Sequence, residues 1–339
     1  MELAIHTEHL TKFYSRRLIA VNDLNLDVPK GAVFGLLGPN GAGKTTTLRL
    51  LLGLQRPSAG RAEVFGRTCG ANAVGVRRMI GYLPTNPRLP GHLRPVEYLD
   101  LLGQFCGMSS QARKPRLASL LRAVGLLGAT SQRIRTFSTG MCTRLGIAAS
   151  LVGDPPLLIW DEPTAGLDPS ARRFTLDLIR ELAPSRTIVV SSHILSDIDQ
   201  VCSHVGVMHE GRMIFCGSIT EMKRRLRRDS FSLEFECHTA AIEDLARKVA
   251  EINAVDSQSV SGDTLTVRLT SGQSRAATLI EILKLAEAAQ LKLQTIRPGR
   301  NETEDVYLQL LQEDEAHGFH RFDRKPNGTV ETVPGDPAV

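Results

Sequence analysis

The chain has 339 residues, with 41 Lys and Arg against 36 Asp and Glu, 42% hydrophobic and 23% charged residues. The length suggests two or three domains, and the composition excludes a disordered or fibrous protein. A formal net charge of +5 does not require a nucleic-acid partner. The longest apolar runs, such as Leu145–Val152, are far shorter than the roughly 18 residues of a membrane span. The polar N-terminus also lacks a secretory apolar segment, so we expect a cytoplasmic protein.

Residues 1–217 alternate short apolar runs with helical periodicity, which is typical of an α/β fold with a parallel sheet. The predicted strands are Ala32–Leu37, Leu157–Trp160, Thr187–Val190 and Val205–Met208. Between the first two of these strands, the apolar spacing of residues 88–152 is helical throughout, and Pro95 suits a helix start. We therefore predict a helical subdomain, about 88–152, inserted into a sheet domain that spans 1–217.

A basic segment, residues 223–228, marks the end of this domain, and we predict a linker over 218–230. The segment is either a solvated helix face or linker, or a contact with anionic lipid headgroups. Beyond it, the pattern predicts an accessory α+β domain over 231–315. Its strands are expected at 231–235, 255–260, 265–269 and 291–296, and its helices at 242–252 and 276–289. This β-α-β-β-α-β order fits a small ferredoxin-like unit, followed by an amphipathic helix near 302–312 and a flexible tail over 316–339.

The strongest local signal is a G-x-x-x-x-G-K-T loop that follows the first predicted strand and opens a Leu-rich helix. The glycines let backbone N–H groups turn inward around an anion, and the helix N-terminus adds partial positive charge. Lys44 can reach the β- and γ-phosphates of a nucleoside triphosphate, and the Thr45 hydroxyl can ligate Mg²⁺. The residues predicted to hold the nucleotide are Gly38, Pro39, Asn40, Gly41, Ala42, Gly43, Lys44, Thr45 and Thr46.

A second predicted strand ends in two adjacent carboxylates, Asp161 and Glu162. Because side chains alternate along a strand, the two acids cannot do the same job. Asp161 is expected to hold Mg²⁺, directly or through water. Glu162 is expected to polarise the attacking water as general base. A Mg²⁺-dependent triphosphate hydrolase follows from this pair and the phosphate loop together.

At this point the chain resembles the ATP-binding subunits of ABC transporters, specifically those that serve separate ABC-2-type export permeases. The resemblance covers about residues 3–217, and the later domain resembles the C-terminal extension of many such subunits. Phe137–Met141 stands where that family has its signature sequence, Gly166–Asp168 resembles the D-loop, and Ser191–His193 resembles the switch-histidine loop. The resemblance implies a P-loop NTPase (RecA-like) domain with a helical insertion and the ligands ATP and Mg²⁺.

The resemblance also implies a role for single residues outside the phosphate loop. Ser138 and Gly140 face the γ-phosphate on a partner copy, Asp168 belongs to the same interface, and Tyr14 stacks on adenine. His193 donates to the γ-phosphate and is counted with Lys44 and Glu162 as catalytic. From the residues alone, Ser138 is equally an N-cap of the helix that begins near Thr139. A lone His at a strand end is commonly a neutral surface residue, and Tyr14 is equally a half-buried strand aromatic.

Two positions depart from the family pattern. Thr85 follows Ile80–Pro84, where relatives carry a Gln or Glu that reaches the metal and the lytic water. Its hydroxyl lies about two bonds closer to the backbone than a Gln amide, so it needs a shifted loop or a bridging water to reach the metal. If the loop slips by one residue, Asn86 takes the place of the missing Gln or Glu. Because of Thr85, we expect slower or less tightly coupled hydrolysis. Thr139 replaces a signature glycine and is therefore expected in a helical or β conformation.

The sequence thus predicts an ATP-hydrolysing export subunit that acts as a homodimer through two sandwiched ATP molecules. It is expected at the cytoplasmic side of the cell membrane, peripheral to a separate permease and without nucleic acid. Two alternatives stay open. One is a soluble ABC ATPase that does not work in transport, and the other is a nucleotide-binding regulatory subunit with low turnover, because of Thr85.

Overall fold

The computed structural model describes residues 2–15, 18–70, 73–226, 230–236, 239–270 and 273–298, together with 307, 310 and 311. A six-stranded sheet in the order β10-β9-β3-β8-β7-β6 forms the centre of the first unit. It is parallel except for β10, which runs antiparallel to β9. The bounds are Val33–Leu37 (β3), Ile80–Leu83 (β6), Leu157–Asp161 (β7), Thr187–Ser192 (β8), His204–His209 (β9) and Arg212–Ser218 (β10). The four strands predicted from apolar runs are confirmed as β3, β7, β8 and β9.

A second, antiparallel sheet in the order β2-β1-β4-β5 was not predicted. Its strands are Leu3–Ser15 (β1), Leu18–Pro29 (β2), Ala59–Val64 (β4) and Arg67–Thr68 (β5). The two long strands pair with several register shifts, and His9 and Asp23 have positive φ, so the apolar alternation is broken along the chain. One core, which includes Ile5, Leu48 and Ile159, joins this sheet, the helix Lys44–Leu51 (α1) and the parallel sheet. A short helix, Val74–Arg77 (α2), precedes β6.

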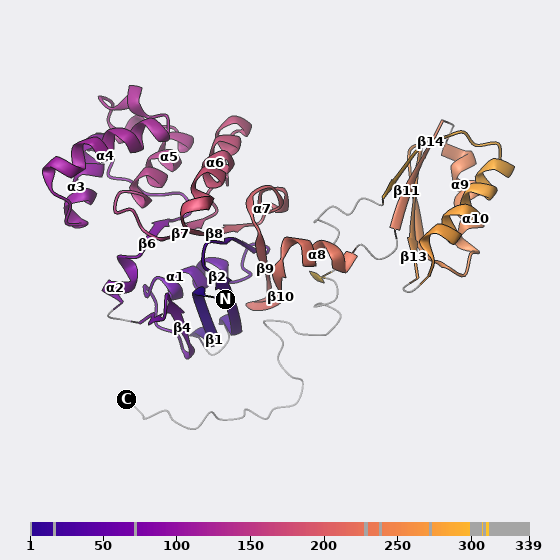
Figure 1. Cartoon of the computed structure of the whole chain (residues 1–339), viewed down its shortest axis with the longest axis horizontal. Coiled ribbons are helices and arrows are strands. Elements are labelled where there is room, and N and C mark those ends of the chain that lie inside the picture. The colour runs from indigo at the N-terminus through magenta and orange to yellow at the C-terminus, as the bar shows by residue number, and fades with distance from the viewer. Residues whose placement is uncertain are drawn as a thin grey trace.

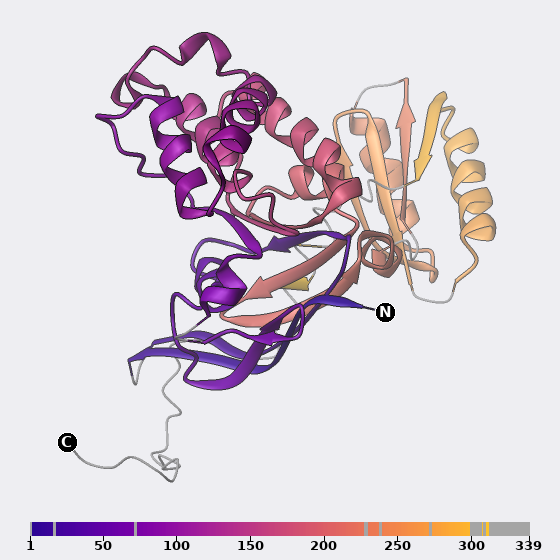
Figure 2. The ribbon, with the colours of Figure 1, turned by 60° about the vertical axis from the view of Figure 1, so that its left-hand side comes forward.

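The predicted helical subdomain corresponds to the helices Pro95–Phe105 (α3), Ser110–Ala123 (α4) and Thr139–Ser150 (α5). Figures 1 and 2 show these helices gathered on the side of the parallel sheet away from β1 and β4. Turns and the short 3₁₀ helices Leu127–Ala129 and Ile134–Thr136 separate α4 from α5. The helices Pro169–Leu182 (α6) and Leu195–Val201 (α7) follow β7 and β8, and the 3₁₀ helix Ala183–Ser185 follows α6.

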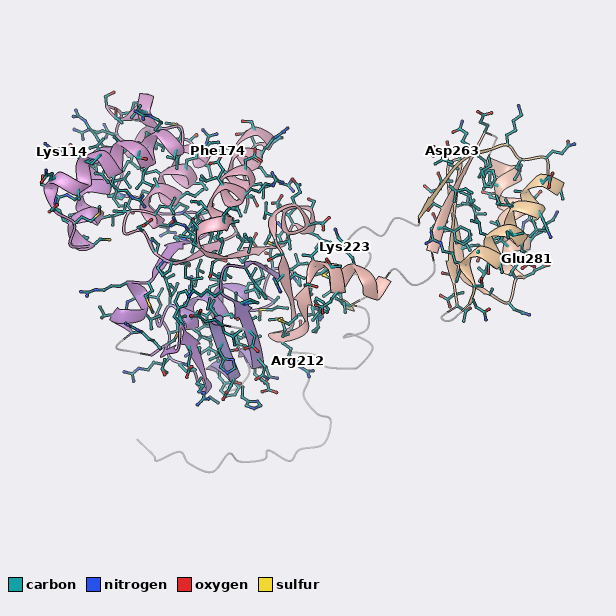
Figure 3. The ribbon with its side chains drawn as sticks, viewed as in Figure 1. Lys114, Phe174, Arg212, Lys223, Asp263 and Glu281 are labelled. Atoms are coloured by element: carbon teal, nitrogen blue, oxygen red, sulfur yellow. The ribbon has the colours of Figure 1, made fainter. Side chains whose placement is uncertain are left out.

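The predicted linker over 218–230 is wrong for most of its length. Residues Ile219–Leu226 form a helix (α8), and Ile219 and Met222 are buried in a cluster with Ile198 of α7. Lys223, labelled in Figure 3, pairs with Asp199 of α7. The basic residues obscured the pattern of Ile219 and Met222, which are three residues apart and therefore lie on one face of a helix. The first unit therefore extends through α8.

The C-terminal unit is a four-stranded antiparallel sheet with two helices on one face (Figure 1). Its elements are Ser230–Phe235 (β11), Thr239–Ala250 (α9), Val255–Ser261 (β12), Thr264–Leu269 (β13), Arg275–Ala288 (α10) and Leu293–Pro298 (β14). The element order is the predicted β-α-β-β-α-β, and the strand order is β12-β13-β11-β14. Of the helix expected near 302–312, residues 307, 310 and 311 are described and are helical, and the predicted tail lies outside the described residues. Within the described residues, no helix is both long and apolar enough to cross a membrane.

Candidate functional site

The predicted site residues meet at one edge of the parallel sheet. The carboxyl ends of parallel strands lie at the same edge, and the register pairs Leu37 of β3 with Ser192 of β8, and Ser191 of β8 with Asp161 of β7. The loops that follow these strands therefore bring segments more than 100 residues apart to one place. This edge is where open α/β sheets bind their ligands.

The phosphate loop follows β3 and is shaped by glycines that no other residue can replace. Gly43 has φ +105°, and a Cβ on it would lie 2.4 Å from the carbonyl oxygen of Ala20. A Cβ on Gly38 would lie 2.4 Å from the carbonyl oxygen of Met208. Lys44, which begins α1, is 5% exposed, and its Nζ donates to the carbonyl oxygen of Gly38 at 2.7 Å. The loop is thus a tight backbone cradle with its cation folded inward.

A cavity of about 420 Å³ opens above this loop. It is large enough for a phosphate chain and lies against the N-terminus of α1, where N–H groups attract anions. Its lining comprises Tyr14, Leu18, Ala20, Pro39, Asn40, Gly41, Ala42, Gly43, Lys44, Thr45, Thr46, Thr85 and Glu162. The structure therefore brings together most of the predicted nucleotide-contacting residues, and adds Leu18 and Ala20 of β2, for which the sequence held no signal.

Asp161 is 1% exposed at the end of β7 and is held by two hydroxyl groups. The Thr45 hydroxyl donates to its Oδ2 at 2.8 Å, and the Ser191 hydroxyl donates to its Oδ1 at 2.6 Å. Thr45 and Asp161 are the two side chains predicted to ligate Mg²⁺, and the fold places their oxygens in contact. This donor set fits Mg²⁺, which usually takes one or two protein oxygens together with phosphate and water. Among the described residues, no group of three or more His, Cys, Asp or Glu could hold a metal alone.

Glu162, the neighbour of Asp161, turns to the cavity instead of the interior of the sheet. One of its carboxylate oxygens lies 3.2 Å from Lys44 Nζ and the other lies 2.8 Å from His193 Nδ1. Its φ of +51° is unusual for a residue with a side chain. The Ser191 hydroxyl accepts a hydrogen bond from its N–H at 2.9 Å. Ser191 thus holds both acids, a contact that a polar residue inside an apolar strand could have signalled.

Thr85 and Tyr14 both line the cavity. The Thr85 hydroxyl donates to the carbonyl oxygen of Asp161 at 3.1 Å, so it lies beside the expected metal position. Tyr14 is 48% exposed, and its hydroxyl donates to Gln55 Oε1 at 2.8 Å. Lys12 Nζ lies 5.7 Å from the centre of the Tyr14 ring. The ring is therefore tethered at its hydroxyl end and contacted by a cation, and it stays accessible from the cavity.

Six predicted residues do not line this cavity. Gly38, Asp161 and His193 contact its lining through Lys44, Thr45 and Glu162, whereas Ser138, Gly140 and Asp168 lie on other elements of the same chain. Ser138 caps α5 and its hydroxyl accepts from the Met141 N–H at 3.3 Å, so the capping interpretation is confirmed. Thr139 is the first residue of α5, in the helical conformation expected of it. Asp168 caps α6, and hydrogen bonds from the N–H groups of Ala171 and Ser170 lower its pKa. Ser138 and Asp168 thus mark two helix N-termini that lie outside the cavity of their own chain.

Comparison with known proteins places this geometry in a family. Residues 21–165 match the family described as ABC transporter. The bacitracin transport ATP-binding protein BcrA of Bacillus licheniformis is 41% identical over 238 residues, which cover 70% of this chain and 76% of the relative. The daunorubicin/doxorubicin resistance ATP-binding protein DrrA of Streptomyces peucetius is 34% identical over 310 residues, which cover 91% of this chain and 92% of that protein. This second match includes the C-terminal unit.

Solved structures agree at the level of the fold. A structure described as the ATP-binding subunit of an ABC transporter is 30% identical, with a TM-score of 0.61, and covers 66% of this chain and 92% of its own length. The dimeric ATP-binding cassette MJ0796 in a post-hydrolysis state with ADP and Pi has a TM-score of 0.59 at 23% identity. The match covers 63% of this chain and 98% of that structure's chain. The chain therefore belongs to the ABC transporter family, as an ATP-binding subunit of the exporter type with ATPase activity.

Proposed function

We propose that this subunit powers export through a separate ABC-2-type permease, as a homodimer that closes on two ATP molecules. The single observation behind the proposal is the incomplete site. Lys44 and Glu162 line one cavity and Asp161 is held by Thr45 of that lining, whereas Ser138 and Asp168 cap helices and do not line it. A second copy related by a twofold axis brings its Ser138 hydroxyl and the N–H groups at the start of its α5 to the cavity of the first, and the same axis does this for both sites at once.

In this proposal each residue at the cavity has one role. Bound ATP supplies a γ-phosphoryl group for transfer to water, with Mg²⁺ held by Thr45 and Asp161. Lys44 leaves the carbonyl oxygen of Gly38 to contact the β- and γ-phosphates, which frees Glu162 to orient water as general base. His193, 2.8 Å from Glu162, donates to the γ-phosphate side. Loss of the γ-phosphoryl group removes the contact shared by the two chains and weakens closure.

The ring of Tyr14 stacks on the adenine in this proposal, because it lines the cavity and is 48% exposed. The backbone N–H groups of Gly41 to Thr46 hold the phosphates. Ser138, Gly140 and Asp168 contact the nucleotide of the partner copy. A Cβ on Gly140 would meet no atom closer than 3.6 Å, so the backbone there is open to a large anion.

Transport is favoured by the relatives, whose names are bacitracin transport and daunorubicin/doxorubicin resistance ATP-binding proteins. We propose on this basis a peripheral position at the cytoplasmic side of the membrane, with no role for nucleic acid. We also place the domain boundary after α8, with an accessory domain over about 230–298, because Leu310 is buried in the cluster of the first unit.

Thr85 favours a second candidate, a nucleotide-binding subunit with low turnover. Its hydroxyl donates to the Asp161 carbonyl oxygen, so its proton is not available to the lytic water. A Gln at this position reaches about two bonds further. Steady-state hydrolysis by the wild type separates the two candidates, because the low-turnover subunit binds ATP but releases phosphate far more slowly than an export subunit.

The proposal is tested with the full chain and its Glu162→Gln variant. We expect the wild type to hydrolyse MgATP, and the variant to lose at least about 100-fold in rate because it lacks the general base. We also expect the variant to elute as a dimer in saturating MgATP, measured by size exclusion with light scattering. A variant that stays monomeric, or hydrolyses as fast as the wild type, contradicts the proposal.

A matched pair of serine variants tests the contact with the partner copy. Ser138 and Ser109 both cap a helix, with a distance of 3.3 Å from the hydroxyl to the N–H three residues on. In the Glu162→Gln background, Ser138→Ala should abolish the ATP-dependent dimer. Ser109→Ala removes an equivalent cap from α4 and should keep the dimer. Equal behaviour of the two variants would show that Ser138 is only a cap.

A further inference from the structure

A buried polar network lies behind the cavity and connects three segments that carry or follow site residues. Asp197 of α7 is 2% exposed and Thr164, in the loop after β7, is 3% exposed. The Thr164 hydroxyl donates to Asp197 Oδ2 at 2.6 Å. Arg172 of α6 donates to Asp197 Oδ1 through Nε at 2.7 Å and lies 2.6 Å away through Nη2. None of these three residues lines the phosphate cavity.

The network spans the two loops that carry Glu162 and His193. Thr164 lies two residues after Glu162, and Asp197 lies four residues after His193. On the cavity side the loops touch through the 2.8 Å contact between Glu162 and His193. On the far side they touch through Thr164 and Asp197. The same two segments are therefore joined twice. The Thr164–Asp197 contact fixes the distance between them, and with it the distance between Glu162 and His193.

Glu162 needs such support because its backbone is in the left-handed region, with φ +51°. A residue with a side chain keeps this conformation only when its surroundings hold it there. The Ser191 hydroxyl holds the Glu162 N–H from β8 at 2.9 Å. Thr164 holds the loop on its other side, so Glu162 lies between two side-chain anchors on different elements.

The charge of Asp197 also indicates a role in positioning. A buried carboxylate is costly unless it is paired and hydrogen-bonded, and an uncharged contact would fill the same space at lower cost. Asp197 satisfies both oxygens with Thr164 and the planar fork of Arg172. Arg172 in turn donates to the Ser196 hydroxyl at 2.9 Å, which adds a second tie to α7. These hydrogen bonds thus fix the position of Thr164 relative to α7 more strictly than packing alone requires.

We propose that Thr164, Asp197 and Arg172 form a positioning clamp that holds Glu162 against His193 in the geometry needed for hydrolysis. The clamp touches neither nucleotide nor metal. It acts through the loop, so it should control the rate of the chemical step and leave the affinity for ATP alone. The inference rests on the roles proposed above for Glu162 and His193.

The test compares Thr164→Val with Thr164→Ser in the full chain. Val has nearly the shape of Thr but lacks the hydroxyl, whereas Ser keeps the hydroxyl. We expect Thr164→Val to lower kcat by about 10- to 100-fold, the effect of a small misplacement of a catalytic group. We expect KM for ATP to stay within about twofold, because the phosphate cradle is built on other elements. Thr164→Ser should restore kcat.

The control is Arg173→Ala, one residue along α6 from Arg172. The Arg173 side chain is 87% exposed and lies 3.9 Å from Asp177, so its removal should leave kcat and KM unchanged. If Thr164→Val does not fold, Arg172→Lys replaces it in the assay, because it keeps the charge and loses the fork. That variant should lower kcat with KM retained.

The clamp is refuted if Thr164→Val keeps full kcat, if Thr164→Ser fails to restore it, or if KM rises as much as kcat falls. The Glu162→Gln variant distinguishes this failure from failure of the proposed function. If Glu162→Gln is as active as the wild type, the role of Glu162 itself is wrong. If Glu162→Gln is inactive and Thr164→Val is fully active, only the clamp is wrong.

Discussion

The parallel sheet of the first unit and the antiparallel sheet of the C-terminal unit differ in how they use their strand ends. Strands β3, β7 and β8 are buried along their whole length and all end at one edge, where Lys44, Asp161 and His193 follow them. In the C-terminal sheet, neighbouring strands run in opposite directions, so their carboxyl ends lie at alternating edges. The parallel sheet therefore brings functional side chains from distant parts of the chain to one edge, whereas the antiparallel sheet places its strand ends at both edges.

The two sheets also belong to separate cores. The C-terminal cluster contains Phe231, Leu233 and Leu265 and shares no residue with the three clusters that include strands of the six-stranded sheet. Its inner face is covered by α9 and α10, and partly exposed apolar residues such as Ile296 remain on β14. Separate cores predict separate unfolding transitions, which makes the comparison testable.

The largest effect is expected from Leu233→Ala in β11. Leu233 is fully buried, so its truncation should lower the free energy of unfolding of the C-terminal unit by about 2–5 kcal/mol. ATP hydrolysis should not change, because the site lies on the other core. Calorimetry of the full chain with and without MgATP measures both transitions. The matched substitution Leu158→Ala in β7 should destabilise the first unit and reduce hydrolysis. A loss of hydrolysis in Leu233→Ala would show that the two units act as one.

A medium effect is expected from Ser191→Ala at the end of β8. The Ser191 side chain bridges Asp161 Oδ1 and the Glu162 N–H, and both become unsatisfied in the variant. The free energy of unfolding should fall by about 1–3 kcal/mol, and hydrolysis should fall with it. Denaturant titration and phosphate release report the two quantities. Ser232→Ala is the counterpart in β11, where the hydroxyl lies 3.0 Å from that of Thr266, and should leave hydrolysis intact. A fully active Ser191→Ala would remove Ser191 from the site.

The smallest effect is expected from pH at β1. Hydrogen bonds to Asp27 and Glu8 raise the pKa of His6 above 6.5. The folded state therefore binds the proton more tightly, so the stabilisation is complete below pH 6.5 and is lost as pH rises through the folded pKa. Because these contacts are near the surface, Tm should fall by no more than about 2 °C between pH 5.5 and 8.5. His6→Gln should remove this slope. A slope unchanged in His6→Gln would disprove the assignment.

The sequence predicted those parts of the molecule in which a single local pattern determines the structure. Strands β3, β7 and β8 are continuous apolar runs because both faces are covered, and the loop before Lys44 needs glycines for its backbone. The antiparallel β1 and β2 were missed, although Leu24, Leu26 and Val28 of β2 alternate with exposed residues. Positive φ at His9 and Asp23, together with register shifts, breaks the alternation in the rest of the pair.

The site was predictable where a motif fixes neighbours in the chain, and not where contacts join distant segments. Asp161 and Glu162 were named from one strand end, but the bridge from Ser191 depends on strand order. Thr164 and Asp197 are 33 residues apart, and neither has a periodic pattern around it. Their contact follows from the position of α7 beside α6, which is a property of the whole fold.

Leu310 attaches the chain to the first unit a second time, after the C-terminal unit. Leu310 is buried in the same cluster as Met222 of α8 and Leu195 of α7, so the chain returns to the first unit after the ferredoxin-like part. The accessory domain is thus an excursion between two fixed points on one surface and not a free end. Because the entropy of closing a loop rises only slowly with its length, this position can accept inserts of different size at little cost. A change in the accessory domain can therefore leave the geometry of the nucleotide site unchanged.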